Sequence, residues 1–226
     1  MEIKNLILII IATINFILGV LILSKNSKKG KNIWFAMIMI GASLWSIGLA
    51  FSREYAGSQI AISWSRSTYL SSLLIGLSLL NFSLLFPYKL KINNITKALV
   101  WLPFVCLFSV MLVKEDFIIK TLTAMPWGYD NVYSYGYLVF SAVFVFYLIW
   151  AFVNLIKKYA ASEGVIKIQL KWIILGLSLA AVFGTIFDLI LPYLGYWKLN
   201  WLGPYFTIFV LFSISYLIFY KSNKQY

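Results

Sequence analysis

The 226-residue chain has no histidine and a single cysteine, Cys106. The absence of histidine excludes imidazole acid–base catalysis, a His-ligated metal and a Ser–His catalytic set. One cysteine forms neither an intrachain disulfide nor a CxxC redox pair. The sequence also has no Gly-rich phosphate-binding loop. We therefore expect no catalytic residues, no metal site and no cofactor, and we expect that the chain is not an enzyme.

Charged residues are scarce, at 12% of the chain, whereas 62% of the residues are hydrophobic. An ordinary soluble domain has about 25% charged and about 45–50% apolar residues. A spanning helix takes about 20 apolar residues, so the chain has room for seven spans and for no sizeable soluble domain. We predict an all-α integral membrane protein, a seven-transmembrane helix bundle that forms a single domain over residues 1–226.

Seven apolar runs, separated by charge, Gly, Pro or Asn, predict the membrane spans. No small-residue cleavage site follows the first run, so we interpret it as an uncleaved helix. The fourth run is marginal in length. The predicted spans cover about residues 6–23, 33–51, 60–86, 98–113, 135–156, 172–191 and 201–220.

The basic residues are distributed unevenly between alternate loops. Loops 24–32, 87–97 and 157–171 and the tail 221–226 hold 13 of the 19 Lys and Arg residues, while the opposite side holds six of the seven acids. The positive-inside rule then predicts a multi-pass protein of the inner (plasma) membrane, with an outside N-terminus and a cytoplasmic C-terminus. Lysines near anionic headgroups account for the net charge of +12. We expect the lipid bilayer as a partner and no nucleic acid.

One loop, Lys114–Ser134, is long. Its segment FIIKTLTAMPWGYDNVYSYG has a β-prone stretch, then Pro126 and Gly128, then alternating aromatic and polar residues. This pattern is compatible with a small hairpin over the outer end of the bundle. A loop of this length usually has a function.

Span 172–191 contains Gly176, Ala180, Gly184 and Asp188 at i+4 spacing, so all four lie on nearly one face. Small residues at this spacing are typical of close helix packing. An acid in a span is costly in lipid, so we expect Asp188 to face protein or water.

Arg66 is the basic residue that lies inside span 60–86, and its depth in the outer leaflet should be similar to that of Asp188. The two side chains could pair or share a polar pocket, which would offset the desolvation of each. Alternatively, both could extend to the outer interface and never meet.

Span 60–86 is also rich in Ser and Thr, which could line a polar cavity or could serve helix packing and bond to their own backbone. Span 201–220 has no lysine, so a retinal Schiff base has no attachment point there.

From Leu155 onward the sequence resembles the N-terminal seven-transmembrane sensor region of bacterial and archaeal membrane histidine kinases. The resemblance is carried by Gln169-Leu170-Lys171, Gly176, Leu191-Pro192 with Gly195, and Leu202-Gly203-Pro204. Looser agreement extends it over nearly the whole chain in helix order, through Arg66 with Tyr69-Leu70, Leu85-Phe86-Pro87 and Pro126-Trp127-Gly128-Tyr129. The position of Asp188 looks more often like Asn in that family. We predict a ligand-binding or polar pocket that includes Arg66, Asp188, Tyr69 and Trp127.

The resemblance implies a sensor module that detects a small ligand or the membrane state from the outer side and signals through span 201–220. The chain ends at Tyr226 and has no histidine to act as phosphoacceptor. We therefore expect the output to come from a cytoplasmic signalling partner, a homodimer or residues beyond Tyr226. The alternative is a small transporter or channel component, with the hydroxyl-rich span 60–86 along its path.

Overall fold

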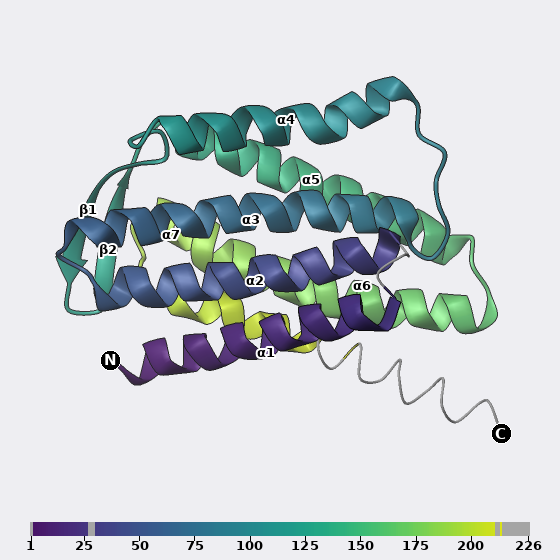
Figure 1. Ribbon diagram of the computed structural model, residues 1–226, viewed down its shortest axis with the longest axis horizontal. Coiled ribbons are helices and arrows are strands. Elements are labelled where there is room, and N and C mark those ends of the chain that lie inside the picture. Colours follow the sequence, from purple (N-terminus) through teal and green to yellow (C-terminus); the bar gives the residue numbers. More distant parts are fainter. Residues whose placement is uncertain (1, 27–29, 211–212, 214–226) are drawn as a thin grey trace.

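The computed structural model describes residues 2–26, 30–210 and 213. Six of its helices are long and apolar enough to cross a membrane. They run side by side, and the chain reverses direction at each connection (Figure 1). The long helices are α1 (Ile3–Asn26), α2 (Gly30–Glu54), α3 (Gln59–Leu85), α4 (Asn94–Val113), α5 (Gly136–Ala160) and α6 (Gly164–Thr185), the last continued by a π-helical turn, η1 (Ile186–Ile190), and by the short α7 (Leu191–Tyr193).

These helices confirm six of the predicted spans, and the marginal fourth run is a full helix of 20 residues. The seventh predicted span, 201–220, begins within η2 (Asn200–Thr207), which is a 3-10 helix. Residues 211–212 and 214–220 of that span lie outside the described part of the chain.

The predicted basic loop 157–171 is wrong in extent. Helix α5 continues to Ala160 and α6 already begins at Gly164, so three residues separate the two helices. Lysines mark the edge of the apolar layer, but Lys and Gln are good helix formers, so both helices continue past that edge.

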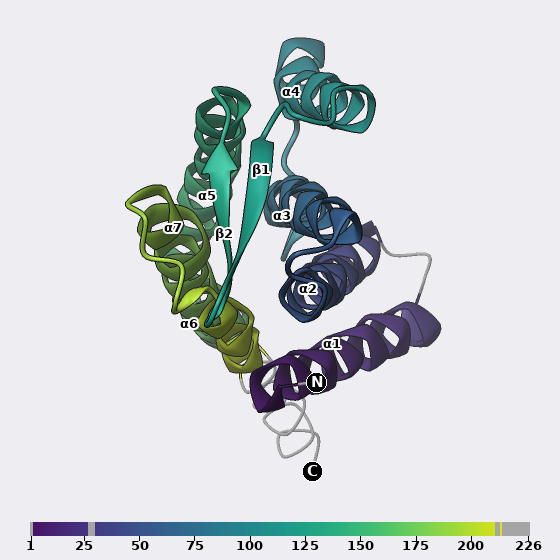
Figure 2. The same cartoon turned by 90° about the vertical axis from the view of Figure 1, so that its left-hand side faces the viewer.

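The loop after α4 folds as the anticipated hairpin. Strands β1 (Ile119–Met125) and β2 (Gly128–Tyr133) pair antiparallel, from Ile119 opposite Tyr133 to Met125 opposite Gly128. A view along the bundle shows the hairpin lying across one end of it, between the α1–α3 side and the α5–α7 side (Figure 2). Gly128 has a positive φ of 128°, and a Cβ there would lie 2.9 Å from Nη1 of Arg53. Glycine therefore permits the turn and its close approach to α2.

The main core lies where α3 packs against α5 and α6. Leu73, Leu80, Tyr147, Leu155 and Leu170 are fully buried there. In contrast, many large apolar side chains of α1, α4 and α5 are exposed, as expected for faces that contact lipid tails.

At the end opposite the hairpin, Lys158 of α5 caps the C-terminus of α3. The residue is 2% exposed, and its ammonium group donates to the carbonyls of Ser83, Phe86 and Tyr88, each at 2.7 Å. The last carbonyls of a helix have no intrahelical partner and carry partial negative charge. One buried cation therefore satisfies the end of α3 and fastens it to α5.

Candidate functional site

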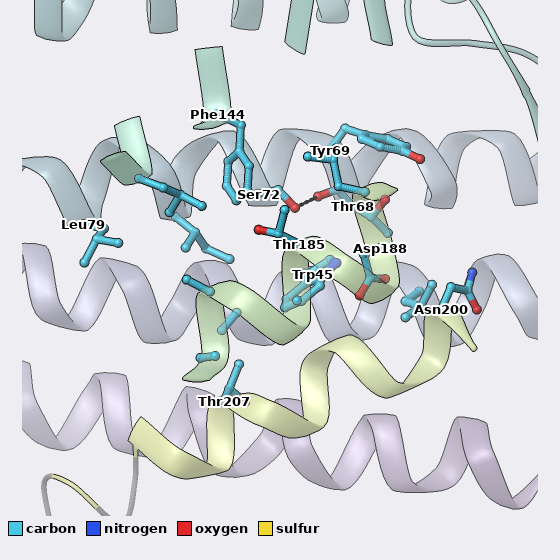
Figure 3. A pocket seen from close by; sticks show the side chains of 18 of the residues that line it. Trp45, Thr68, Tyr69, Ser72, Leu79, Phe144, Thr185, Asp188, Asn200 and Thr207 are labelled. Atoms are coloured by element: carbon cyan, nitrogen blue, oxygen red, sulfur yellow. Dashed lines mark hydrogen bonds between the residues drawn. The ribbon is translucent and has the colours of Figure 1, made fainter. Parts of the chain in front are cut away.

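The bundle encloses a cavity of about 100 Å³. Its walls come from α2 and α3 on one side and from α5, α6 and η1 on the other, and η2 with the preceding Trp197 closes it (Figure 3). Most of the lining is apolar and aromatic. The polar groups that line it are Thr68, Tyr69, Ser72, Tyr129, Thr185, Asp188, Asn200 and Thr207.

Asp188 lies in the π-helical turn at the end of α6. The amide of Leu191 donates to the carbonyl of Ile186, five residues earlier. Pro192 explains this turn, because a proline has no N–H and its ring would clash with the carbonyl four residues before it, which here belongs to Asp188. Widening the helix by one residue per turn relieves that clash, and such bulges occur often at functional sites.

The carboxylate of Asp188 faces the cavity without a protein partner on one oxygen. Oδ2 is buried and accepts no hydrogen bond from the described residues. A buried polar atom without a partner costs about 1–3 kcal/mol, and more when it is charged. Asp188 lines the cavity, in agreement with the expectation that it faces protein or water, and its unpaired oxygen marks a place where a ligand group could bind.

Asp188 also contacts Gly203 of η2, near the start of the last predicted span, 201–220. A Cβ on Gly203 would overlap the Asp188 carboxylate, and it would lie 3.2 Å from the ring of Trp45. The same ring lies 3.2 Å from the Cβ position of Gly184. Glycine at 203 is thus required for close packing of η2 on the site.

Gly176 and Gly184 on α6 serve close packing, as their spacing predicts. A Cβ on Gly176 would lie 2.8 Å from the carbonyl of Phe209 and would overlap the hydroxyl of Ser213. On this face of α6, Gly176 contacts Phe209 and Ser213, Asp188 contacts Gly203, and Gly184 lies against Trp45 of α2.

Three hydroxyl groups in the cavity wall donate their protons to backbone carbonyls of their own segments. Thr68 donates to Ser65 O, Ser72 to Thr68 O and Thr207 to Pro204 O, at 2.6–2.8 Å. What these groups offer the cavity is oxygen lone pairs. The polar lining is consequently rich in hydrogen-bond acceptors.

Three tyrosines connect the cavity with the hairpin. The Tyr69 hydroxyl lies 2.9 Å from that of Tyr133 in β2, and the Tyr133 ring stacks on Tyr137 with centroids 3.7 Å apart. Tyr137 in turn donates to the carbonyl of Leu189, the neighbour of Asp188, at 2.6 Å. Burial raises the pKa of Tyr133 well above its ordinary value, so its phenol stays neutral.

The predicted pairing of Arg66 with Asp188 is wrong. Arg66 donates through Nη2 to the carbonyl of Met111 at 2.7 Å, and its Nη1 lies 3.8 Å from Glu115 Oε1. The last turn of α4 therefore supplies Arg66 with closer partners. Asp188 lies beside Trp45 of α2, in a different cavity from the one that Arg66 lines.

Of the four residues predicted for the pocket, the structure brings Tyr69 and Asp188 to the same cavity. Trp127 lies at the hairpin turn, where its Nε1 donates to Asp130 Oδ1 at 3.0 Å and its ring packs with a small cluster around Tyr129 and Trp197. Arg66 and Trp127 thus flank the site from outside.

Sequence reasoning missed Arg53 and Asn200, which build a polar cluster at the hairpin end. Arg53 is 5% exposed, donates to Asn5 Oδ1 at 3.1 Å and to Asn200 Oδ1 at 3.2 Å, and lies 3.5 Å from Glu2 Oε2. Arg53 falls at the outer end of a predicted span, and so do Glu2, Asn5 and Asn200. Their shared position at the outer end is the sequence feature that could have indicated a polar cluster. Among the described residues, no group of three His, Cys, Asp or Glu side chains could hold a metal ion.

These features define a multi-pass helical membrane protein with a cavity between its helices beside Asp188. The family model described as the N-terminal 7TM region of histidine kinase matches residues 7–222, so the chain belongs to that family. The family is a sensor input region and is not itself catalytic. No curated protein and no solved structure gives a significant match to the chain.

Proposed function

We propose that this chain is a sensory module of the inner membrane that binds a small molecule in the cavity beside Asp188. Occupancy of the cavity shifts η2, and the last predicted span, 201–220, transmits the shift to the cytoplasmic side. The observation that carries the proposal is the unpartnered Oδ2 of Asp188 in contact with Gly203. Membership of the histidine-kinase input family supports the sensory role.

Coupling between the cavity and η2 follows from the packing of Gly203 against Asp188. A group that binds Asp188 competes for the carboxylate against which the backbone at Gly203 rests. A ligand shifts a conformational equilibrium by its difference in affinity for the two arrangements. A ligand at this contact meets that requirement because its binding energy depends on where η2 lies.

The loop geometry supports the proposed orientation. The α3–α4 connection, with Lys89 and Lys91, and the adjoining ends of α5 and α6, with Lys157, Lys158 and Lys167, lie at the same end of the bundle, and the start of α1 and the hairpin lie at the other (Figure 1). We propose that the lysine-rich end is cytoplasmic. A reporter enzyme that is active only in the periplasm should then be silent when it is fused after Tyr226.

The hydroxyl groups of α3 give little support to a transport path. Ser67, Thr68 and Ser71 each donate to a carbonyl of the preceding turn of their own helix. Ser72 and Ser83 do the same. This pattern satisfies the side chains locally, as Ser and Thr commonly do in membrane helices.

The proposal is tested by filling the cavity with a side chain. Ala181 lines the cavity from α6, so Ala181→Phe places a phenyl ring where a ligand would bind. We would fuse a histidine-kinase output domain after Tyr226 and measure autophosphorylation in membranes. We expect Ala181→Phe to change the rate by several-fold at equal protein level.

Ala98→Phe is the matched control, because Ala98 is exposed on α4 and lies away from the cavity. It should leave autophosphorylation unchanged. Equal rates for the parent and for both variants, each folded and inserted, would contradict the sensory role of the cavity.

A further inference from the structure

We propose that the ligand is a small organic cation, a protonated primary amine on a short apolar body, whose ammonium group binds Asp188. This inference rests on the proposed function and narrows it to a class of ligand. It is argued from the charge, the hydrogen-bonding capacity and the shape of the cavity.

The charge of the lining favours a cation. Asp188 is the one acidic residue among the described residues that line the cavity, and none of them is Lys or Arg. Arg66 bonds to Met111 and lies near Glu115, outside the cavity. Arg53 also lies outside the lining and bonds to Asn5 and to the lining residue Asn200, while its Nη2 has no hydrogen-bond partner among the described residues and lies 3.5 Å from Glu2. A buried carboxyl group stays ionised only beside a counter-charge, and the described residues that line the cavity provide none, so a bound cation would supply it.

The hydrogen-bonding groups of the cavity also favour a ligand that donates hydrogen bonds. The protons of Thr68, Ser72 and Thr207 are donated to backbone carbonyls, so their oxygens can accept but have no second proton to give. An ammonium group has three protons and accepts none. It therefore matches the Asp188 carboxylate and these three hydroxyl oxygens, whereas a carboxylate ligand would be repelled by the same four groups.

The walls suit a short apolar body next to the charge. Trp45, Tyr69, Phe140, Phe144 and Trp197 line the cavity, and their rings attract cations as well as apolar groups. A cavity of about 150 Å³ holds benzene, so one of about 100 Å³ takes a molecule of slightly smaller size. A four-carbon amine fits this limit.

The required ammonium group could come from a free amine in the medium or from the headgroup of phosphatidylethanolamine. Both present the same chemistry to Asp188. The experiment therefore uses nanodiscs of phosphatidylglycerol, which contains no amine, and adds the probes from solution.

Three probes of matched size separate charge from shape: n-butylamine, 1-butanol and butyrate, all at pH 7. Binding would be measured by the rise in thermal unfolding temperature, since a ligand that binds the folded state raises it. We expect n-butylamine to bind at least about tenfold more tightly than 1-butanol, as a desolvated charge pair should. Butyrate should give no shift.

Asp188→Asn keeps the shape of the side chain and removes the charge, and it should abolish the preference for n-butylamine over 1-butanol. Asp116→Asn is the matched control, because Asp116 is exposed and lies outside the cavity. It should keep the full preference. If Asp188→Asn does not fold, the probe series on the unmodified protein decides.

Equal binding of n-butylamine and 1-butanol, stronger binding of butyrate or no binding of n-butylamine would overturn the cation class. None of these results bears on the Ala181→Phe measurement, so the sensory proposal stands or falls separately. A second arm uses nanodiscs that contain phosphatidylethanolamine. If the unfolding temperature without added amine is higher than in phosphatidylglycerol, and n-butylamine binds more weakly, the lipid is the source of the ammonium group. An unchanged n-butylamine response there identifies the free amine.

Discussion

At the scale of single residues, two contacts carry much of the organisation of the molecule. One is the contact of Gly203 with the Asp188 carboxylate, which fixes the approach of η2 to the cavity. The other is the bonding of the Lys158 ammonium to the carbonyls at the end of α3.

Gly203→Ala should destabilise the protein, because the added methyl group overlaps Asp188 and approaches Trp45. Overpacking of this kind costs about 1–3 kcal/mol, which thermal unfolding in detergent would show as a lower midpoint. Asp188→Ala should rescue part of this loss in the double variant, since it removes the overlapping atoms. Gly30→Ala is the control, because its Cβ would meet a flexible Leu85 methyl group at 3.2 Å. Additive effects at 203 and 188 would refute the contact.

Lys158→Met keeps the length of the side chain and removes the donor to three carbonyls. Hydrogen bonds to charged groups contribute about 1.5–3 kcal/mol each, and buried acceptors left without a donor add to the cost. We expect a loss of about 2–4 kcal/mol in unfolding free energy. Lys157→Met, at the exposed neighbouring position, should stay within about 0.5 kcal/mol of the parent. Similar losses for both variants would mean that the cap does not stabilise α3.

At the scale of elements, the hairpin is more than a loop between α4 and α5. Asn131 of β2 donates to Ser65 Oγ of α3 at 2.9 Å, and the Tyr69–Tyr133 contact repeats this link one turn further along α3. Through Tyr137 the same strand reaches the carbonyl of Leu189. The hairpin thus holds α3, α5 and η1 in register around the cavity.

The buried phenol of Tyr133 predicts a dependence of stability on pH. Its folded-state pKa is raised by burial, whereas the unfolded phenol ionises near pH 10. The contribution of the neutral phenol is complete below about pH 10 and is lost as pH rises toward the folded-state pKa. Between pH 9 and 11, the unfolding temperature of Tyr133→Phe should therefore fall less than that of the parent.

Above the pKa of unfolded Tyr133, the free energy of unfolding of the parent should fall faster than that of Tyr133→Phe by at most about 1.4 kcal/mol per pH unit. Tyr196→Phe serves as the control because Tyr196 is exposed, and it should follow the parent. Parallel curves for all three proteins would show that Tyr133 is accessible to hydroxide in the folded state.

At the scale of the whole molecule, the bundle was predictable and the site was predictable in part. Apolar runs and alternating charge indicate the six helices and the hairpin, because span length and turn chemistry act locally. The partner of Arg66 was not predictable, since it depends on which helix lies beside α3. The depth of a charge in the membrane does not say which face of the bundle it occupies.

Asp188 also shows which features of the site a local sequence pattern predicts and which it does not. Its cost in lipid predicted that it faces protein or water, and it lines the cavity. The contact with Gly203 and Trp45 joins three elements that are distant in sequence, so no local pattern could indicate it. The π-helical turn before Pro192 was equally hidden, although the proline that causes it is visible in the sequence.

The central claim is that what fills the cavity sets the position of the last predicted span. It is tested most directly by a spin-label distance between Lys157, at the exposed end of α5, and Ser222, both changed to cysteine in a Cys106→Ser background. Ala181→Phe should shift the main distance, whereas Ala98→Phe should leave the distribution of the parent unchanged. Superimposable distributions for the parent and for Ala181→Phe would contradict the account.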